Sequence, residues 1–177
     1  LGDGGMVETS GRILNINQAR VSTIATAGST GLWLLDPGNI NITDSGTTDS
    51  DSLPSFPVGS DTDIHPTSVV NALGSSNVTI QTGSGSYDLT ISSAISYSGS
   101  NNLTLEAGQD VWINAAVDID SGDLTITSGR NLTVGADLNS AAFTATVTGD
   151  ATINNAINSG SGTLTIDADN DLTVGAN

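Results

Sequence analysis

The chain has 177 residues, of which 21 are glycine and none is cysteine, so neither disulfides nor thiolate metal sites are available to it. Three basic residues stand against nineteen acidic ones, and the resulting formal net charge of −16 repels nucleic-acid phosphates and anionic membrane surfaces. Because no apolar run approaches the roughly 20 residues that span a bilayer, we expect neither nucleic-acid binding nor membrane insertion.

Two segments near the amino end have a distinctive sequence. Residues 4–11 read GGMVETSG, and residues 31–42 read GLWLLDPGNINI. Both ends of the chain, LGDGG at residues 1–5 and LTVGAN at residues 172–177, also fall inside patterned sequence. We therefore expect residues 1–177 to be a single fragment of a larger protein, and we expect the fragment to be monomeric.

Residues 43–66 interrupt the pattern. This segment contains three prolines, five aspartates and the only histidine, His65. Proline cannot donate to the hydrogen-bond ladder of a sheet interior, so the segment is predicted to form a loop. Residues 69–73, which read VVNAL, are interpreted as the end of the preceding coil. The next short strands are predicted at residues 78–80 and 89–91, with Ile95 in a third position.

Residues 103–174 repeat the pattern apolar-Thr-apolar in two interleaved series. The first series begins at residues 103, 124, 145 and 164. The second series begins at residues 111, 132, 151 and 172. A third apolar position follows at residues 117, 138 and 157. The spacing is 21 residues except for one interval of 19 in each series, and on this register a turn at 147–151 has lost two residues.

Alternation with a period of two and many β-branched residues exclude a helix for these repeats. The sequence predicts an all-β fold, a right-handed parallel β-helix (solenoid) with about 21 residues and three strands per coil. Leu, Ile and Val face inward, Thr faces outward, and residues 43–66 leave the helix wall as an excursion. Asparagine ladders across neighbouring coils are predicted for Asn114, Asn131, Asn154, Asn155 and Asn170.

The two amino-terminal segments carry a family resemblance. They resemble the GG-x-VETSG and WLLDP-x-[ND]-[IV]-x-I segments of large bacterial exoproteins of the filamentous-haemagglutinin type, including high-molecular-weight adhesins exported by two-partner secretion. The resemblance covers the first 42 residues by motif and the rest by repeat style. The secretion domain of that family, with its NPNG-type motifs, has no counterpart here, so an outer-membrane transporter is expected as a partner of the parent protein only. The resemblance implies a secreted or cell-surface adhesin.

Aspartates are the candidate metal ligands, but most of them fall in predicted turns. Residues 167–171 begin like a calcium loop, yet they lack the glycine and the twelfth-position glutamate of an EF-hand, so they are interpreted as a six-residue corner. Asp118, Asp120 and Asp123 are placed between strands in the same way. No cofactor is expected. Weak Ca²⁺ binding stays open only at the aspartates of the loop, which are Asp44, Asp49, Asp51, Asp61 and Asp63.

The sequence offers no catalytic constellation. A glycosidase needs two carboxylates in one groove, and lyases typically need a basic group beside bound calcium. Lysine is absent, Arg130 stands alone at a turn, and His65 has no partner that the sequence reveals. We therefore predict no catalytic residue and no enzyme activity.

Three hypotheses of function remain. The leading one, which the resemblance implies, is a structural shaft that supports attachment, aggregation or biofilm formation. The alternative is a module that binds a glycan or a host-cell or matrix receptor through the 43–66 loop and Trp112, an outward aromatic able to stack on a sugar ring. A remote alternative is an ice-binding face made of outward threonines, one per strand. Trp33 is expected to pack under a neighbouring loop.

Overall fold

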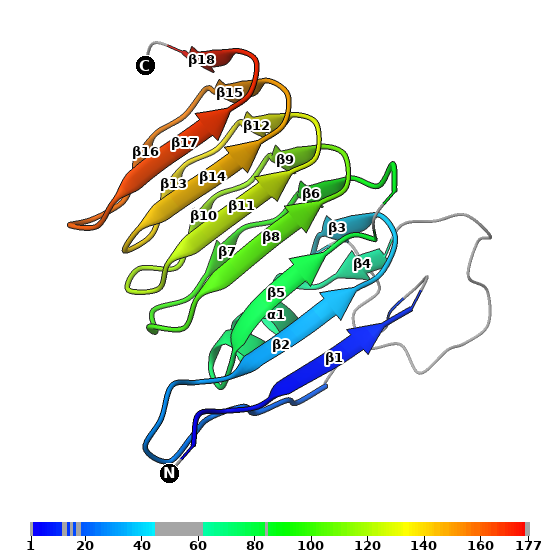
Figure 1. The fold of residues 1–177 in the computed structure, drawn as a ribbon, viewed down its shortest axis with the longest axis vertical. Helices are drawn as coiled ribbons and strands as arrows, with labels where there is room; N and C mark the ends of the chain where they lie inside the picture. The colour runs from blue at the N-terminus through cyan, green and yellow to red at the C-terminus, as the bar shows by residue number, and fades with distance from the viewer. Residues whose placement is uncertain are drawn as a thin grey trace.

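The computed structural model describes residues 2–11, 14, 16, 19–44, 62–83 and 85–175. These residues form a stack of parallel β-coils, which confirms the predicted all-β parallel β-helix (Figure 1). From β5 (Asn77–Gln81) onward the chain climbs the stack toward its carboxyl end, whereas β4 (Thr62–Ile64) lies outside β3 (Ile40–Ile42) at the amino end. All strand pairs among the described residues are parallel. Parallel pairing is required because each coil brings the chain back to the same wall in the same direction.

Three sheets make the walls. Sheet A contains, in spatial order, β1 (Met6–Ser10), β2 (Leu32–Asp36), β5 (Asn77–Gln81), β8 (Leu103–Ala107), β11 (Leu124–Ser128), β14 (Phe143–Val147) and β17 (Leu164–Ala168). Sheet B contains β4 (Thr62–Ile64), β3 (Ile40–Ile42), β6 (Leu89–Ile91), β9 (Val111–Ile113), β12 (Leu132–Val134), β15 (Ala151–Ile153) and β18 (Leu172–Val174). Sheet C contains β7 (Ile95–Ser96), β10 (Val117–Asp118), β13 (Leu138–Asn139) and β16 (Ile157–Asn158).

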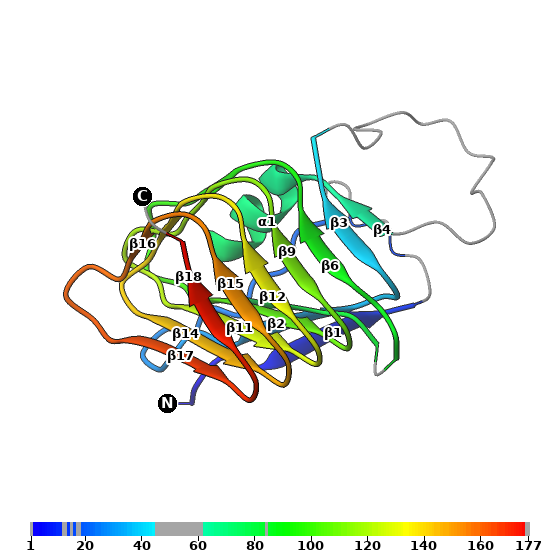
Figure 2. The same ribbon diagram turned by 90° about the horizontal axis from the view of Figure 1, so that it is seen from above.

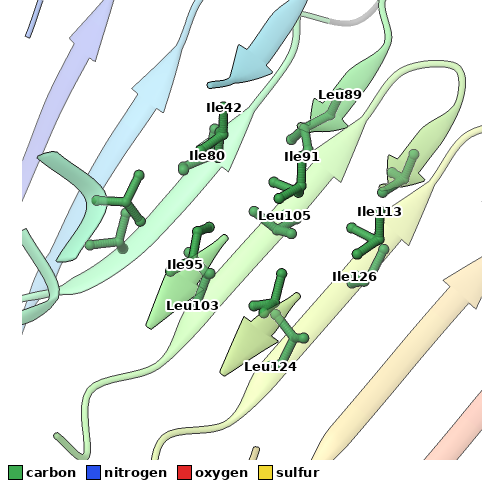
Figure 3. Packing of buried hydrophobic residues seen from close by; sticks show 14 of the residues in the cluster. Ile42, Ile80, Leu89, Ile91, Ile95, Leu103, Leu105, Ile113, Leu124 and Ile126 are labelled. Carbon is green, nitrogen blue, oxygen red and sulfur yellow. The ribbon is translucent and has the colours of Figure 1, made fainter. Parts of the chain in front are cut away.

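The core lies between the three walls and consists of stacked aliphatic side chains (Figure 3). Alternate residues of a strand face the same side, so each apolar-Thr-apolar strand sends two side chains inward. Ile80, Leu105 and Ile126 stack in register from sheet A, and all three are fully buried. Each coil therefore buries its apolar side chains against those of the coils above and below.

One detail of the predicted register is wrong. Leu124 pairs with Phe143 and Phe143 pairs with Leu164, whereas Ala145, the predicted partner of Leu124, pairs with Ile126. The corner from β14 to β15 therefore has the same length as the corner from β11 to β12, and the predicted shortening at 147–151 is absent. The two missing residues belong to the turn between Leu138 and Phe143, which connects sheet C to sheet A.

The error has a simple physical origin. The segment FTATV of β14 contains the apolar-Thr-apolar pattern twice, and a shift by two residues keeps every side chain on its own face. The turns of the two neighbouring coils are longer, and each includes a residue of positive φ, Asp120 at 42° and Gly160 at 54°. The shorter turn lets Phe143, which is fully buried, occupy the inward position that Leu124 and Leu164 hold in their coils.

The amino end of the stack departs from the prediction for residues 43–66 and 69–73. Residues 62–64 form β4, which pairs with β3, so this part of the predicted excursion belongs to the wall. Residues 66–73, predicted in part as the end of a coil, form the helix α1 (Pro66–Leu73). Residues 45–61 of the predicted loop lie outside the described residues.

Local sequence explains the helix. Pro66 occupies the first helical turn, where a missing N–H costs nothing, and His65 is the N-cap whose Nδ1 accepts the Thr67 N–H at 3.2 Å. Val69 and Leu73 are fully buried and four residues apart, so they share one helix face. The helix contacts β5 and β7, and Asn101 Nδ2 donates to the Leu73 carbonyl at 2.6 Å.

The two ends of the stack differ. The helix α1 packs beside β7, the outermost strand of sheet C at the amino end. At the carboxyl end, β17 and β18 are the outermost strands of sheets A and B, and the side chains of Leu164, Leu172 and Val174 are 50, 49 and 67% exposed. None of the helices among the described residues is long and apolar enough to cross a membrane.

Candidate functional site

The outer face of sheet B carries a continuous row of side chains that includes an exposed aromatic residue. Figure 2 shows its strands side by side from β18 to β4. Middle residues of successive strands pair in register and form the row Asp63, Asn41, Thr90, Trp112, Thr133, Thr152 and Thr173. Trp112 is the aromatic member of this row, and 39% of it is exposed. The prediction that Trp112 faces outward is therefore confirmed.

A hollow of about 270 Å³ lies on the same face, over β3 and β6. Its lining residues are Asn39, Ile40, Asn41, Asp88, Thr90 and Ser92. The polar residues of the lining are separated by two positions along each strand, which places their side chains on the outer face together. Trp112 stands on β9, directly beside Thr90 across one strand spacing of about 4.8 Å.

A ladder of side-chain oxygens holds the corner that leads into sheet B. At each rung an Oδ1 atom accepts the backbone N–H of the equivalent residue in the next coil, at 2.9 to 3.3 Å. The accepting residues are Asn39, Asp88, Asp110, Asn131 and Asp150, and Asp171 donates the backbone N–H of the last bond. Of the predicted ladder residues, Asn131 belongs to this set, because its Oδ1 accepts the Asp150 N–H. The carboxylates at this corner therefore have a structural role.

Asp110 is the most buried residue of this ladder. Its side chain is 5% exposed and receives the Arg130 guanidinium through Nε at 2.7 Å and through Nη2. The hydrogen bonds from Arg130 hold the pKa of Asp110 below its ordinary value of 3.8; the Asn131 N–H acts in the same direction, and burial opposes both. Arg130, predicted to stand alone at a turn, instead pairs with Asp110.

Replacing Asp110 with alanine is expected to lower the free energy of unfolding at pH 7 by about 1–3 kcal/mol, because the Asn131 N–H and Arg130 both lose their acceptor. Asp110→Asn is the matched control. It keeps an Oδ1 acceptor, as Asn39 and Asn131 do in other rungs, and removes only the charge. Urea unfolding of both variants measures the difference. Equal stability of the wild type and Asp110→Ala would show that the rung contributes nothing.

The same pair predicts a pH dependence. A carboxylate whose folded pKa is lowered stabilises the fold above its unfolded pKa, and this stabilisation is lost as the pH falls below 3.8 toward the folded value. We therefore expect the stability gap between the wild type and Asp110→Asn to be constant from pH 7 to about pH 5 and to shrink below pH 4. Comparing the free energies of unfolding of the two proteins cancels the titration of the aspartates that they share. A difference at pH 3 as large as that at pH 7 would contradict the prediction.

The predicted weak calcium ligands do not come together in the described part of the chain. Asp44 accepts from Ser93 Oγ at 2.8 Å, and Asp63 accepts from Asn41 Nδ2 at 3.4 Å. Asp49, Asp51 and Asp61 lie outside the described residues. Among the residues that are described, no three His, Cys, Asp or Glu side chains gather as a metal site would require.

The remaining predicted turn aspartates have local roles. Asp118 lies in β10 and accepts from Asn139 Nδ2 at 2.8 Å, and Asp123 donates its N–H to Asn102 at 2.9 Å. Asp167 is not part of a corner, as predicted, but an outward residue of β17. The strands of sheet A therefore extend two residues beyond the triplet that the sequence suggested.

Trp33 and His65 are structural residues. Trp33 is 1% exposed and belongs to the stacked core, and its Nε1 donates to Thr9 Oγ1 of the adjacent strand at 3.0 Å. His65, predicted as a loop residue, is the N-cap of α1. The sequence contained the signal for this cap, because Pro66 and Gly74 flank residues with helical apolar spacing.

The outward threonines of sheet A form one long row and one short row. Thr144, and not Thr146 as predicted, pairs with Thr125 and Thr165. Thr146 pairs with Thr127, so β11 and β14 each show two outward threonines. This double row is bounded by Glu106 and Asp167 in the neighbouring strands. Among the described strands of sheet A, the pairs of outward threonines typical of an ice-binding face are therefore confined to two coils.

The chain was compared with protein-family models, with curated proteins and with solved structures, and none of the three comparisons found a match. The class of the molecule thus rests on its own geometry. It is a three-walled β-solenoid with an acidic surface, an internal aliphatic stack and a polar hollow on one wall.

Proposed function

We propose that this chain is a shaft segment of a secreted or cell-surface bacterial adhesin, which supports attachment, aggregation or biofilm formation by holding other regions away from the cell. The observation that carries the proposal is the continuity of the stack. Sheets A and B each keep parallel register through seven strands. The sequence resemblance of residues 4–11 and 31–42 to filamentous-haemagglutinin-type exoproteins points to the same role.

The physical properties of the stack suit such a shaft. Each coil contacts mainly the coils above and below it, so length is added at about 4.8 Å per coil without a change of fold. Backbone hydrogen bonds between strands run along the axis of the rod and resist its extension. The net charge of −16 keeps neighbouring rods apart and soluble.

A whole-coil deletion tests the proposal in the bacterium that encodes the chain. Removing residues 132–150 joins Asn131 to Ala151. Ala151 pairs with Leu132 in the adjacent strand, so it takes the place of Leu132 after the deletion. We expect antibody fragments against residues 62–175 to label intact cells of both the wild type and this deletion strain, and attachment to be unchanged. The matched control removes residues 132–141, which takes away β12 and β13 but leaves β14, and we expect it to abolish surface labelling and attachment together.

Two outcomes would overturn the proposal. Labelling that requires permeabilised cells would place the chain inside the cell. Loss of attachment in the whole-coil deletion with normal surface labelling would show that the deleted coil binds a target directly and is not a passive spacer.

A further inference from the structure

The outer face of sheet B combines an exposed aromatic side chain with a polar hollow on the adjoining strands. Trp112 is 39% exposed, although the equivalent positions in the neighbouring coils are the much smaller Thr90 and Thr133. An indole that projects between threonines stands above the surface of the sheet. The hollow begins on the next strand, where Thr90 is one of its lining residues.

The polar groups of the hollow are held in position by hydrogen bonds within the wall. Asn39 Oδ1 accepts the Asp88 N–H at 2.9 Å, and Asp88 Oδ1 accepts the Asp110 N–H at 3.0 Å. Asn41 Oδ1 accepts from Ser92 Oγ at 2.7 Å. Because the side chains are already ordered, a ligand that bonds to them has little conformational entropy to remove.

The types of group in the hollow favour a ligand rich in hydroxyls. Asparagine amides donate and accept, threonine and serine hydroxyls do both, and the Asp88 carboxylate has acceptor capacity beyond its bond to Asp110. The volume of about 270 Å³ lies just below the usual range of about 300–1,000 Å³ for small-molecule sites, so the hollow suits a small ligand. A single sugar ring has this size and this pattern of donors and acceptors.

The negative charge of this wall favours an uncharged ligand. Asp88 lines the hollow, Asp63 stands beside Asn41 in the same row, and the whole chain carries a net charge of −16. A carboxylate, sulfate or phosphate on a ligand would be repelled at this wall. A neutral sugar avoids this cost and can still lay the apolar C–H face of its ring on an indole.

We propose that the outer face of sheet B binds a neutral oligosaccharide, with one sugar ring against Trp112 and the next over the hollow lined by Asn41, Asp88 and Thr90. The spacing supports two adjacent subsites, because β9, β6 and β3 are successive strands about 4.8 Å apart. This site does not depend on the shaft role, since the same wall would bind sugar wherever the protein is located.

The test is a titration of the purified chain with neutral tetrasaccharides of β1,4-linked glucose, mannose and N-acetylglucosamine, followed by tryptophan fluorescence and calorimetry. We expect at least one of them to change the fluorescence of Trp112. In Trp112→Ala, the remaining Trp33 is 1% exposed and serves as an internal reference that should not respond. The affinity of that variant should fall by at least about tenfold, the equivalent of about 1.4 kcal/mol.

Matched variants on the same wall separate a binding site from a loss of fold. Thr133→Ala lies on the other side of Trp112 from the hollow and should bind like the wild type. Thr90→Lys places a long side chain in the hollow and should also weaken binding. Each variant should unfold at the same urea concentration as the wild type, because outward side chains contribute little to stability.

Three results would overturn the proposal. The first is no binding of any of the three neutral sugars at up to about 10 mM, the weak end of measurable affinity. The second is equal affinity of the wild type and Trp112→Ala. The third is tighter binding of a sialylated tetrasaccharide than of the neutral ones, because the acidic wall should reject it.

Discussion

Replacing Ile126 with alanine is expected to lower the free energy of unfolding by about 2–5 kcal/mol. Ile126 is fully buried in β11, between Leu105 of the coil below and Ala145 of the coil above (Figure 3). Removing its outer carbons leaves a cavity that the hydrogen-bonded walls cannot close, because their spacing is set by strand pairing. Guanidinium unfolding followed by far-ultraviolet circular dichroism measures the effect.

The control for this prediction is the preceding residue. Thr125 lies on the same strand but faces outward, so Thr125→Ala should change stability by less than about 1 kcal/mol, the usual span of strand propensity. Similar losses in both variants would mean that the inward and outward faces of β11 have been assigned incorrectly.

Replacing Gly129 with alanine should produce the second large loss, about 1–3 kcal/mol. A Cβ atom at this corner would lie 2.4 Å from the carbonyl oxygen of Gly108 in the coil below. That neighbour is backbone, and Gly129 is itself held by the bond from its N–H to the Ala107 carbonyl at 2.9 Å. Neither group can move without opening the spacing between two coils, so the strain is expected to spread into the adjoining strands.

Gly83 provides the matched control for the corner. It also follows a strand of sheet A, but a Cβ there would lie 3.7 Å from the Tyr87 ring and 3.9 Å from the Pro37 carbonyl oxygen, which are both ordinary contacts. Gly83→Ala should therefore leave the denaturation midpoint within the small range typical of surface substitutions. A Gly129→Ala variant as stable as Gly83→Ala would show that the coils can separate at this corner at little cost.

The proposed shaft and the proposed sugar site place different demands on the same wall. The shaft needs the inward residues of β3, β6 and β9 to stack, and these residues are fully or almost fully buried. The sugar site uses the outward residues, whose replacement leaves the stack in place. A solenoid can therefore carry a lateral binding site on one coil without losing its mechanical continuity.

Much of the fold could be predicted because strand alternation is a local property. The triplets at residues 103, 124 and 164 contain apolar residues two positions apart with threonine between them, and only a strand buries both of them on one side. Recurrence at about 21 residues then requires a coil that returns to the same wall. The outward position of Trp112 follows from the same alternation, and it is the part of the candidate site that the sequence revealed.

The hollow beside Trp112 could not be predicted in this way. Its lining comes from two segments about 50 residues apart, near Asn41 and near Thr90, which become neighbours only when β3 pairs with β6. Between them in the sequence lie the strand β4, the helix α1 and the strand β5. No spacing in the sequence indicates which strand will lie beside β3 after such an interruption.

The sequence by itself determined the type of coil, the inward and outward faces and the outward position of Trp112, because these depend on the parity of positions along a strand. Only the tertiary structure decided the register at β14, the helix at residues 66–73 and the pairing of Arg130 with Asp110. A two-residue shift preserves parity, so alternation cannot detect it. The register of β14 is decided by which residue fills the space between Leu124 and Leu164. The predicted β-helix is thus set by local periodicity, while its exact stacking is set by packing between coils.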